Sequence, residues 1–157
     1  MGGESLTIND GTFGNGFNLV GNWTGCTADV VVNGSGVLDL RTDDMSFDTL
    51  SGNGTVGNSY YLSEAFNTLT LGTGNGTATF IGNIRGAGGG ANDSSLDAGN
   101  IALVKNGTGT QTLSGNNTYN GTTTINAGTL EVGASGRLGA GSYAQNITNN
   151  GTLIYSG

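Results

Sequence analysis

Short runs in which apolar and polar residues alternate recur along the chain and predict half-buried β-strands. The runs are TATF (77–80), TQTL (110–113), TLEV (129–132) and TLIY (152–155), with VLDL (37–40) and TLTL (68–71) upstream. Alternation places Leu130 and Val132 on the inner face of their strand, and threonine and acidic residues outside. The same holds for Leu153 and Tyr155. These runs predict strands and not helices, so we expect an all-β fold.

A turn dipeptide, usually Asn-Gly, recurs with nearly constant spacing. Its glycines are Gly16, Gly34, Gly54, Gly76, Gly107, Gly128 and Gly151, at steps of 18, 20, 22, 31, 21 and 23 residues. About 20 residues hold three short strands and three turns, which is one coil of a β-helix whose rungs stack about 4.8 Å apart. We therefore predict a parallel β-helix of about seven coils in one domain, 1–157, with these glycines in a single vertical file.

The longest step contains RGAGGGANDSSLDAGN (85–100), which predicts an insertion that loops out of one coil. Such loops tolerate sequence change and carry recognition. The predicted contact residues are Asn92, Asp93, Ser94, Ser95 and Asp97. Residues 88–97 are also similar to the calcium-binding nonapeptide, but Ala91 replaces a required glycine and Ser95 replaces the apolar residue. One imperfect copy predicts a loop, because calcium sites of that type need stacked consecutive copies.

An antiparallel β-sandwich or an up-and-down barrel is the alternative fold, since both also have short strands and frequent turns. Independent strands have no reason to keep a common period with the same turn dipeptide. The few apolar residues also favour the solenoid, because each strand needs only two or three inward side chains that stack on those of the next coil.

The composition excludes several classes of function. The chain has 32 glycines, no proline and a net charge of −7, and its only basic residues are Arg41, Arg85, Lys105 and Arg137. No basic stripe exists to bind nucleic acid. The absence of histidine removes the commonest general base and metal ligand, and the single cysteine, Cys26, excludes an internal disulfide framework. We predict no cofactor, and no membrane insertion of this segment because no apolar stretch is long enough.

One stretch, LVKNGTGTQTLSGNNTYNGTTTINAGTLEVG (103–133), closely resembles the autotransporter-associated β-strand repeat, also called the passenger-associated transport repeat. That family has a lysine, a G-T-G-x-x-x-L-S-G-x-N-x-Y run and a G-x-T-x-I-x-x-G-x-L run. The matching residues are Lys105, Gly107, Gly109, Leu113, Ser114, Gly115, Asn117, Tyr119, Gly121, Thr123, Ile125, Gly128 and Leu130. Looser resemblance extends over most of the chain, but not over residues 1–28 or 85–100.

The resemblance implies a right-handed parallel β-helix from the passenger of a type V secreted or surface-displayed bacterial protein. Such segments act as stalks and adhesive surfaces, and folding of the repeats outside the cell assists secretion. It implies an extracellular or cell-surface location, with outer-membrane attachment through a segment outside this chain. The expected partners are other copies, neighbouring repeats, or a glycan or protein on a host or neighbouring cell. Both ends of the chain lack polar caps, which favours self-association.

Two other functions stay open. Asp43, Asp44 and Asp48 lie close in sequence and could serve a glycan-cleaving β-helix, whose paired carboxylates stand about 6.5 to 9.5 Å apart in inverting enzymes. A solvated turn explains them more simply, so we predict no enzyme. Stacked T-x-T pairs can match an ice lattice, and the chain has Thr68/Thr70, Thr77/Thr79, Thr110/Thr112 and Thr122/Thr124. Ordinary outward threonines explain these pairs better. Trp23 is expected to pack at an exposed end.

Overall fold

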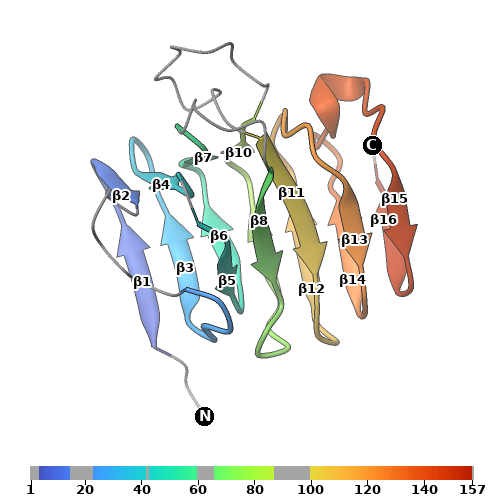
Figure 1. Ribbon diagram of the computed structural model, residues 1–157, viewed down its shortest axis with the longest axis horizontal. Coiled ribbons are helices and arrows are strands. Elements are labelled where there is room, and N and C mark those ends of the chain that lie inside the picture. The colour runs from blue at the N-terminus through green and yellow to red at the C-terminus, as the bar shows by residue number, and fades with distance from the viewer. Residues whose placement is uncertain (1–3, 15–22, 42, 60–65, 87–99, 157) are drawn as a thin grey trace.

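The chain folds into a parallel β-solenoid whose strands stand side by side along one axis (Figure 1). The computed structural model describes residues 4–14, 23–41, 43–59, 66–86 and 100–156. Every strand ladder in these ranges is parallel. This confirms the all-β stacked-coil fold and contradicts an antiparallel sandwich or barrel.

Three sheets run along the solenoid, and the chain visits them in turn. Sheet A has, in order, β1 (Ser5–Ile8), β3 (Asp29–Val32), β6 (Leu50–Gly52), β9 (Ala78–Phe80), β12 (Thr110–Leu113), β14 (Thr129–Val132) and β16 (Thr152–Tyr155). Sheet B has β2 (Thr12–Gly14), β4 (Val37–Asp39), β7 (Thr55–Gly57) and β10 (Asn83–Ile84). Sheet C has β5 (Met45–Phe47), β8 (Phe66–Leu71), β11 (Asn100–Lys105), β13 (Thr123–Ile125) and β15 (Ile147–Asn149). A 3₁₀ turn, η1 (Gly139–Gly141), precedes β15.

Strand register places matching side chains in files inside the solenoid. One file of sheet A runs Ile8, Val32, Gly52, Phe80, Leu113, Val132 and Tyr155. The large Phe80 lies beside Gly52, so ring and glycine complement each other in volume. Leu130 and Val132 are buried, as predicted. Tyr155 also lies in this file but is 67% exposed, because β16 is the edge strand of sheet A among the described residues.

The predicted single file of glycines is not found, because the six glycines lie at two different corners. Gly34 and Gly54 follow strands of sheet A and precede strands of sheet B. Gly76, Gly107, Gly128 and Gly151 precede strands of sheet A at the other corner. Each corner occurs once per coil, so the spacing of about 20 residues between successive turn glycines is kept, although the glycines move from one corner to the other. Gly16 lies outside the described residues.

The predicted insertion falls between β10 and β11 in the sequence. The structure describes its first two residues, and Asn100 already belongs to β11, where it pairs with Phe66. The predicted contact residues Asn92, Asp93, Ser94, Ser95 and Asp97 all lie outside the described residues.

Candidate interaction surfaces

Lys105, in the stretch that carries the repeat motif, lies inside the solenoid. Its file in sheet C runs from Leu71 through Lys105 to Ile125, and the side chain is 1% exposed. The ammonium donates to the backbone oxygens of Asn106 and Gly107 at the following corner. Burial lowers the pKa of Lys105 below its ordinary value, and attraction to Asp48 opposes this shift. Lys105 therefore caps corner carbonyls and is not available to an external ligand.

Tyr119 and Thr123 of the same stretch form a series of hydrogen bonds with Tyr143, which lies beyond it. The hydroxyl oxygens of Tyr119 and Thr123 are 2.8 Å apart, and those of Thr123 and Tyr143 are 2.7 Å apart. The Tyr143 hydroxyl donates to the Gly121 oxygen at 2.6 Å. Tyr119 is fully buried, and its burial raises the pKa of its phenol above the ordinary value. These hydrogen bonds join adjacent coils in the C-terminal half of the solenoid.

Buried amides bridge coils in the same way. The Gln111 amide donates to the Leu50 oxygen at 2.8 Å and accepts from the Leu50 nitrogen at 3.1 Å. The small Ala78 pairs with Gln111 in sheet A and leaves room for this long reach. Asn117 accepts from the Ile84 nitrogen at 3.1 Å. The sequence pattern does not predict these hydrogen-bond partners. Alternation shows which side chains face inward, but not which groups of the neighbouring coil they contact.

Two of the three aspartates considered for catalysis bind backbone groups of the solenoid. Asp44 and Asp48 lie at opposite ends of β5, and each accepts hydrogen bonds from backbone nitrogens. Asp44 accepts from Thr68 at 2.7 Å, and Asp48 accepts from Gly74 at 2.7 Å and Gly76 at 2.8 Å. These carboxylates cap backbone groups of the next coil. Asp43 is half-buried and has its own interaction partner.

One acidic residue on an outward position is nevertheless buried. Asp39 is only 4% exposed, while Leu38 and Leu40 on either side of it belong to the core, as the alternation in VLDL predicts. Its carboxylate accepts from the backbone nitrogens of Arg41 and Ser59 and from the Ser59 hydroxyl. The chain around Ser59 therefore covers this part of sheet B.

The T-x-T pairs do not form one continuous array. On sheet A, Thr79 pairs with Thr112, but the next strand places Glu131 beside Thr112. On sheet C, the pairs of β8 and β13 are separated by β11, where Val104 lies between Thr70 and Thr124. A regular lattice match needs the same pair in successive coils, and two adjacent pairs are the longest run.

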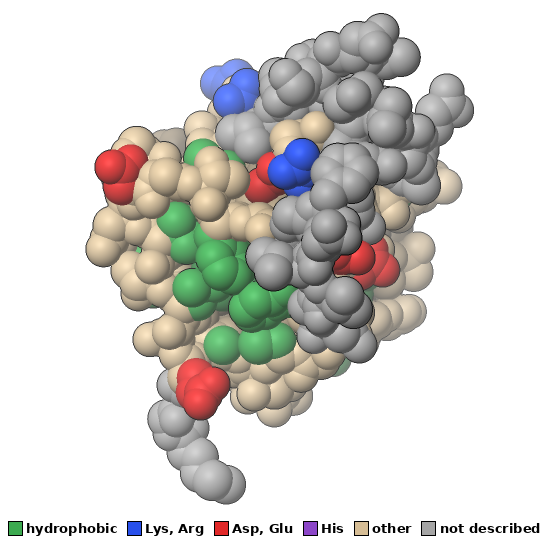
Figure 2. Space-filling model, turned by 60° about the vertical axis from the view of Figure 1, so that its left-hand side comes forward, with side chains coloured by type: hydrophobic (Ala, Val, Ile, Leu, Met, Phe, Trp, Pro, Cys, Tyr) green, Lys and Arg blue, Asp and Glu red, His purple; other side chains and the backbone are tan. Residues whose placement is uncertain are grey.

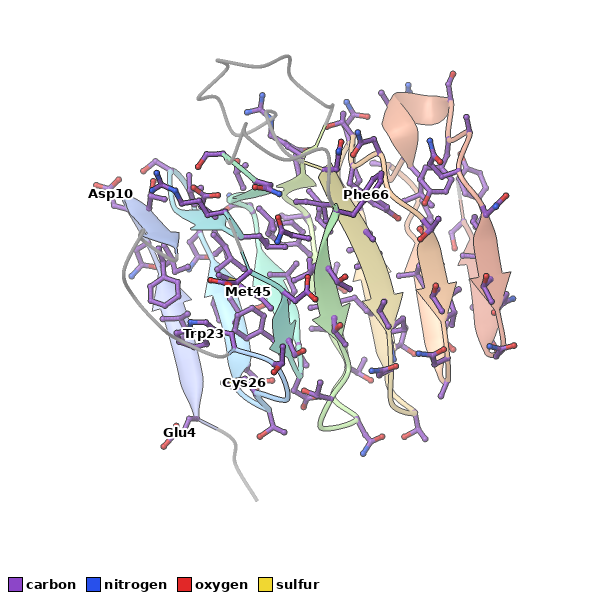
Figure 3. The ribbon with its side chains drawn as sticks, viewed as in Figure 1. Glu4, Asp10, Trp23, Cys26, Met45 and Phe66 are labelled. Atoms are coloured by element: carbon purple, nitrogen blue, oxygen red, sulfur yellow. The ribbon has the colours of Figure 1, made fainter. Side chains whose placement is uncertain are left out.

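The N-terminal end exposes apolar side chains, which gather in one patch in Figure 2. Leu6, Phe13, Trp23 and Cys26 are partly buried and pack against the core. Trp23 lies close to Met45, with which it forms an isolated bridge (Figure 3). It also makes a T-shaped contact with Phe13, with ring centroids 5.3 Å apart. Trp23 thus packs at an end of the solenoid, as expected. Cys26 is a partly exposed free thiol.

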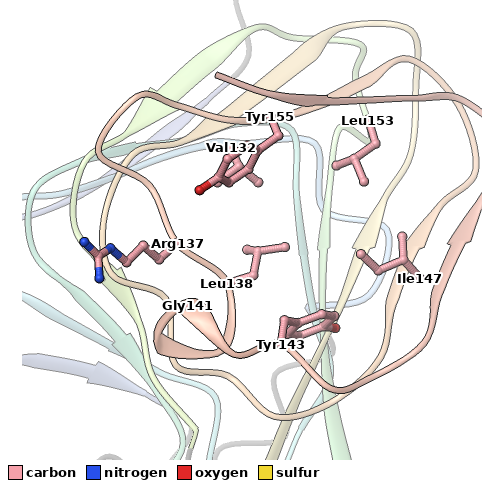
Figure 4. A pocket seen from close by; sticks show the side chains of 8 residues that line it. All are labelled: Val132, Arg137, Leu138, Gly141, Tyr143, Ile147, Leu153 and Tyr155. Atoms are coloured by element: carbon pink, nitrogen blue, oxygen red, sulfur yellow. The ribbon is translucent and has the colours of Figure 1, made fainter. Parts of the chain in front are cut away.

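The C-terminal end carries an open pocket of about 330 Å³ (Figure 4). Its lining is mostly apolar and consists of Val132, Arg137, Leu138, Gly141, Tyr143, Ile147, Leu153 and Tyr155. The pocket lies beside β16, the last strand of sheet A, which has a partner on one side only. Apolar area and an unpaired strand edge are the features that other β-strands recognise.

The described residues contain no cluster of three or more His, Cys, Asp or Glu side chains able to hold a metal ion. A helix with the length and hydropathy required to cross a membrane is also lacking in these ranges.

Comparison with known proteins gives one family and one relative. The family model described as "Passenger-associated-transport-repeat" matches residues 103–132. Over 156 aligned residues, 94% of this chain, the sequence is 35% identical to a protein named "Adhesin BmaC autotransporter" from Brucella suis biovar 1 (strain 1330). The alignment covers 4% of that protein, so the chain spans a small part of its relative's length. No solved structure matches the chain.

Proposed function

Residues 103–132 are a passenger-associated transport repeat within a parallel β-solenoid, and from this premise we propose that the chain is a non-enzymatic stalk and adhesive segment of an autotransporter-type passenger. One observation carries the proposal: the polar residues of the repeat are buried and hydrogen-bonded inside the solenoid. Lys105 caps carbonyls of its own corner, whereas Asn117 and Thr123 bond to residues of adjacent coils. The repeat therefore builds a rod, and its outer faces are left for contact.

The similarity to an autotransporter adhesin supports a surface or extracellular location. Attachment to the outer membrane through a segment outside this chain is part of the proposal, as is assistance of secretion by folding of the repeats. The proposed ligands are a glycan or protein on a host or neighbouring cell. The segment 87–99 lies between β10 and β11 in the sequence and is the first place to look for this contact.

Displaying the chain on a test bacterium through an unrelated membrane anchor tests both the stalk role and the adhesive role. We expect the displayed chain to resist protease and to increase attachment to host cells above the anchor alone. Replacement of residues 88–97 by a glycine-serine linker should reduce attachment and leave protease resistance unchanged. Attachment equal to that of the anchor alone would refute the adhesive role, and rapid proteolysis throughout the chain would refute the stalk.

The enzymatic alternative has a direct test. Asp44 and Asp48 already accept backbone hydrogen bonds, so we expect the chain to cleave no glycan. Glycan cleavage by the wild-type chain that is lost in an Asp43→Asn, Asp44→Asn, Asp48→Asn variant would overturn this conclusion. Retention of the circular dichroism spectrum by that variant would show that the loss is not caused by unfolding.

Self-association is the second proposed activity, and apolar side chains that the structure leaves partly exposed favour it. Among them are Leu6 of β1 and Phe13 of β2, with Trp23 packed on Phe13, and Leu153 and Tyr155 of the pocket. We expect sedimentation velocity to show concentration-dependent association that Tyr155→Ser weakens. Strictly monomeric sedimentation at high protein concentration would exclude it.

A further inference from the structure

One junction between coils in the interior of the solenoid is held differently from its neighbours. β6 and β9 are both three residues long, and each forms three pairs with its other neighbour in sheet A, β3 and β12 respectively. Between the described strands β6 and β9, a single pair forms, Gly52 with Phe80. We propose that this junction is a hinge, at which sheet A opens while sheet C holds the two coils together.

A side chain takes the place of backbone partners at the start of β6. The Leu50 nitrogen and oxygen bond to the Gln111 amide, at 3.1 and 2.8 Å, and this amide reaches past β9 from β12. At the preceding junction of sheet A the backbones bond directly, since the Val30 nitrogen donates to the Thr49 oxygen at 2.8 Å. Leu50 is therefore tied to the next coils by a side chain and not by the backbone of β9.

The corner before these strands shows the same replacement. Asp48 precedes β6, and its carboxylate accepts hydrogen bonds from the Gly74 and Gly76 nitrogens, at 2.7 and 2.8 Å, in the corner before β9. At the junction of β12 and β14 a backbone oxygen is the acceptor, because the Thr129 nitrogen donates to the Gly109 oxygen at 3.1 Å. Side chains thus hold much of the sheet A side of the proposed hinge.

Gly52 bends β6 where the remaining pair forms. Its φ is +95°, in the left-handed region that side chains disfavour and that a regular strand does not contain. A glycine of this kind inside a strand marks a local bend in the ladder. Beyond it the coils are joined again, because the Ile81 nitrogen donates to the Gly52 oxygen at 2.9 Å. The bend explains why two strands of equal length pair at one position.

Sheet C supplies the axis of the hinge. At the same junction β8 and β11 lie side by side and pair over six consecutive residues, from Phe66 with Asn100 to Leu71 with Lys105 (Figure 1). Sheet B adds two pairs between β7 and β10. The backbone pairing therefore increases from sheet A to sheet C, so opening on the sheet A side breaks the fewest backbone bonds.

Hydrogen exchange of the full chain, resolved by residue with NMR, tests the hinge. The reporters are the backbone amides of Leu50 and Ile81, on the two sides of the junction, and that of Leu103, which donates to the Thr122 oxygen at an intact junction. Leu50 and Leu103 are equally buried. We expect Leu50 and Ile81 to have similar protection factors, at least about tenfold below that of Leu103, because one local opening exposes both.

Two results of this measurement would overturn the proposal. Protection of Leu50 and Ile81 equal to that of Leu103 would show that the junction does not open by itself. Low protection of Leu50 alone, with Ile81 as protected as Leu103, would show that the Gln111 side chain moves without separation of the coils.

A pair of disulfide variants separates opening at this junction from general mobility of sheet A. In a Cys26→Ser background, Ser51→Cys with Thr79→Cys links β6 to β9 one residue before the remaining pair of each strand. Thr79→Cys with Thr112→Cys links the directly paired residues of β9 and β12 and is the matched control. Neighbouring strands lie about 4.8 Å apart, which suits the Cα separation of a disulfide.

Each variant is compared with its own reduced form. Oxidation of the first link should raise the protection factors of Leu50 and Ile81 at least about tenfold, whereas the control link should leave them within about twofold. No rise with the first link, or an equal rise with both links, would overturn the proposal. The readout is the conformation of the chain alone, so the result does not depend on the adhesive role.

Discussion

Polar side chains at inward positions stabilise the solenoid because each one finds a hydrogen-bond partner. Gln111, Lys105 and Thr123 all lie in files that are otherwise apolar. A buried polar group without a hydrogen bond costs about 1–3 kcal/mol, so these residues are favourable only with their partners in place. Alternation in TQTL predicts that Gln111 shares the inner face with Leu113. It does not predict the bond to Leu50, which depends on the shortness of Ala78 in the intervening strand.

Gln111→Met tests this bridge with little change in volume. The thioether cannot replace the amide, so the Leu50 nitrogen and oxygen lose their partner in the core. We expect the free energy of unfolding to fall by about 2–4 kcal/mol. Urea denaturation followed by circular dichroism measures it. Thr124→Ala, on an outward position of β13, is the control and should cost under about 1 kcal/mol. Equal losses in the two variants would contradict the bridge.

Tyr119 makes stability depend on alkaline pH. Burial raises the folded-state pKa of this phenol above the ordinary value of 10.0. The unfolded chain therefore releases its proton first, and stability that is complete below about pH 10 decreases as the pH rises toward the folded-state pKa. In Tyr119→Phe we expect a shallower decrease, measured by urea denaturation at a series of alkaline pH values. Identical slopes for both proteins would show that Tyr119 does not contribute.

At the scale of elements, corners are set by glycines that allow one coil to approach the next. A Cβ atom on Gly115 would lie 1.7 Å from the Gly82 oxygen, and one on Gly82 would lie 2.1 Å from the Gly54 oxygen. These three glycines form a vertical file, and only Gly54 among them belongs to the predicted series of turn glycines. The Asn-Gly dipeptide marks turns, but both corners use it, so the dipeptide alone does not say which corner it forms.

Gly115→Ala separates close approach from backbone conformation. The added methyl group meets a backbone oxygen that cannot move without separating two coils, so we expect a loss of about 4 kcal/mol or more. Gly25→Ala is the matched control, because Gly25 has φ +76° and no atom within 4 Å of the added methyl. That variant pays only for the left-handed backbone, about 1 kcal/mol. Thermal denaturation compares them, and a larger loss at Gly25 would contradict the close-approach explanation.

At the scale of the whole molecule, the sequence predicts the architecture better than the surfaces. The period and the alternating runs identify stacked parallel coils, because both follow directly from the geometry of one rung. Strands such as β3 and β11 were not among the predicted runs, since DVVV and NIALVK are nearly continuous apolar segments without alternation. The apolar ends and the bonds of Asp44 and Asp48 could not be predicted, because they depend on contacts between coils.

A solenoid in which each coil contacts only its neighbours should be most stable in the middle. Leu113 on β12 is fully buried between two strands, whereas Leu153 on β16 is partly exposed and has a strand on one side. We expect Leu113→Ala to cost about 3 kcal/mol, since it leaves a cavity, and Leu153→Ala under about 1.5 kcal/mol. Hydrogen exchange should likewise be slowest in β11 and β12 and fastest in β1 and β16. Uniform exchange across the strands of sheet A, with equal losses in both variants, would mean that the coils unfold as one unit and that the ends are as firmly held as the centre.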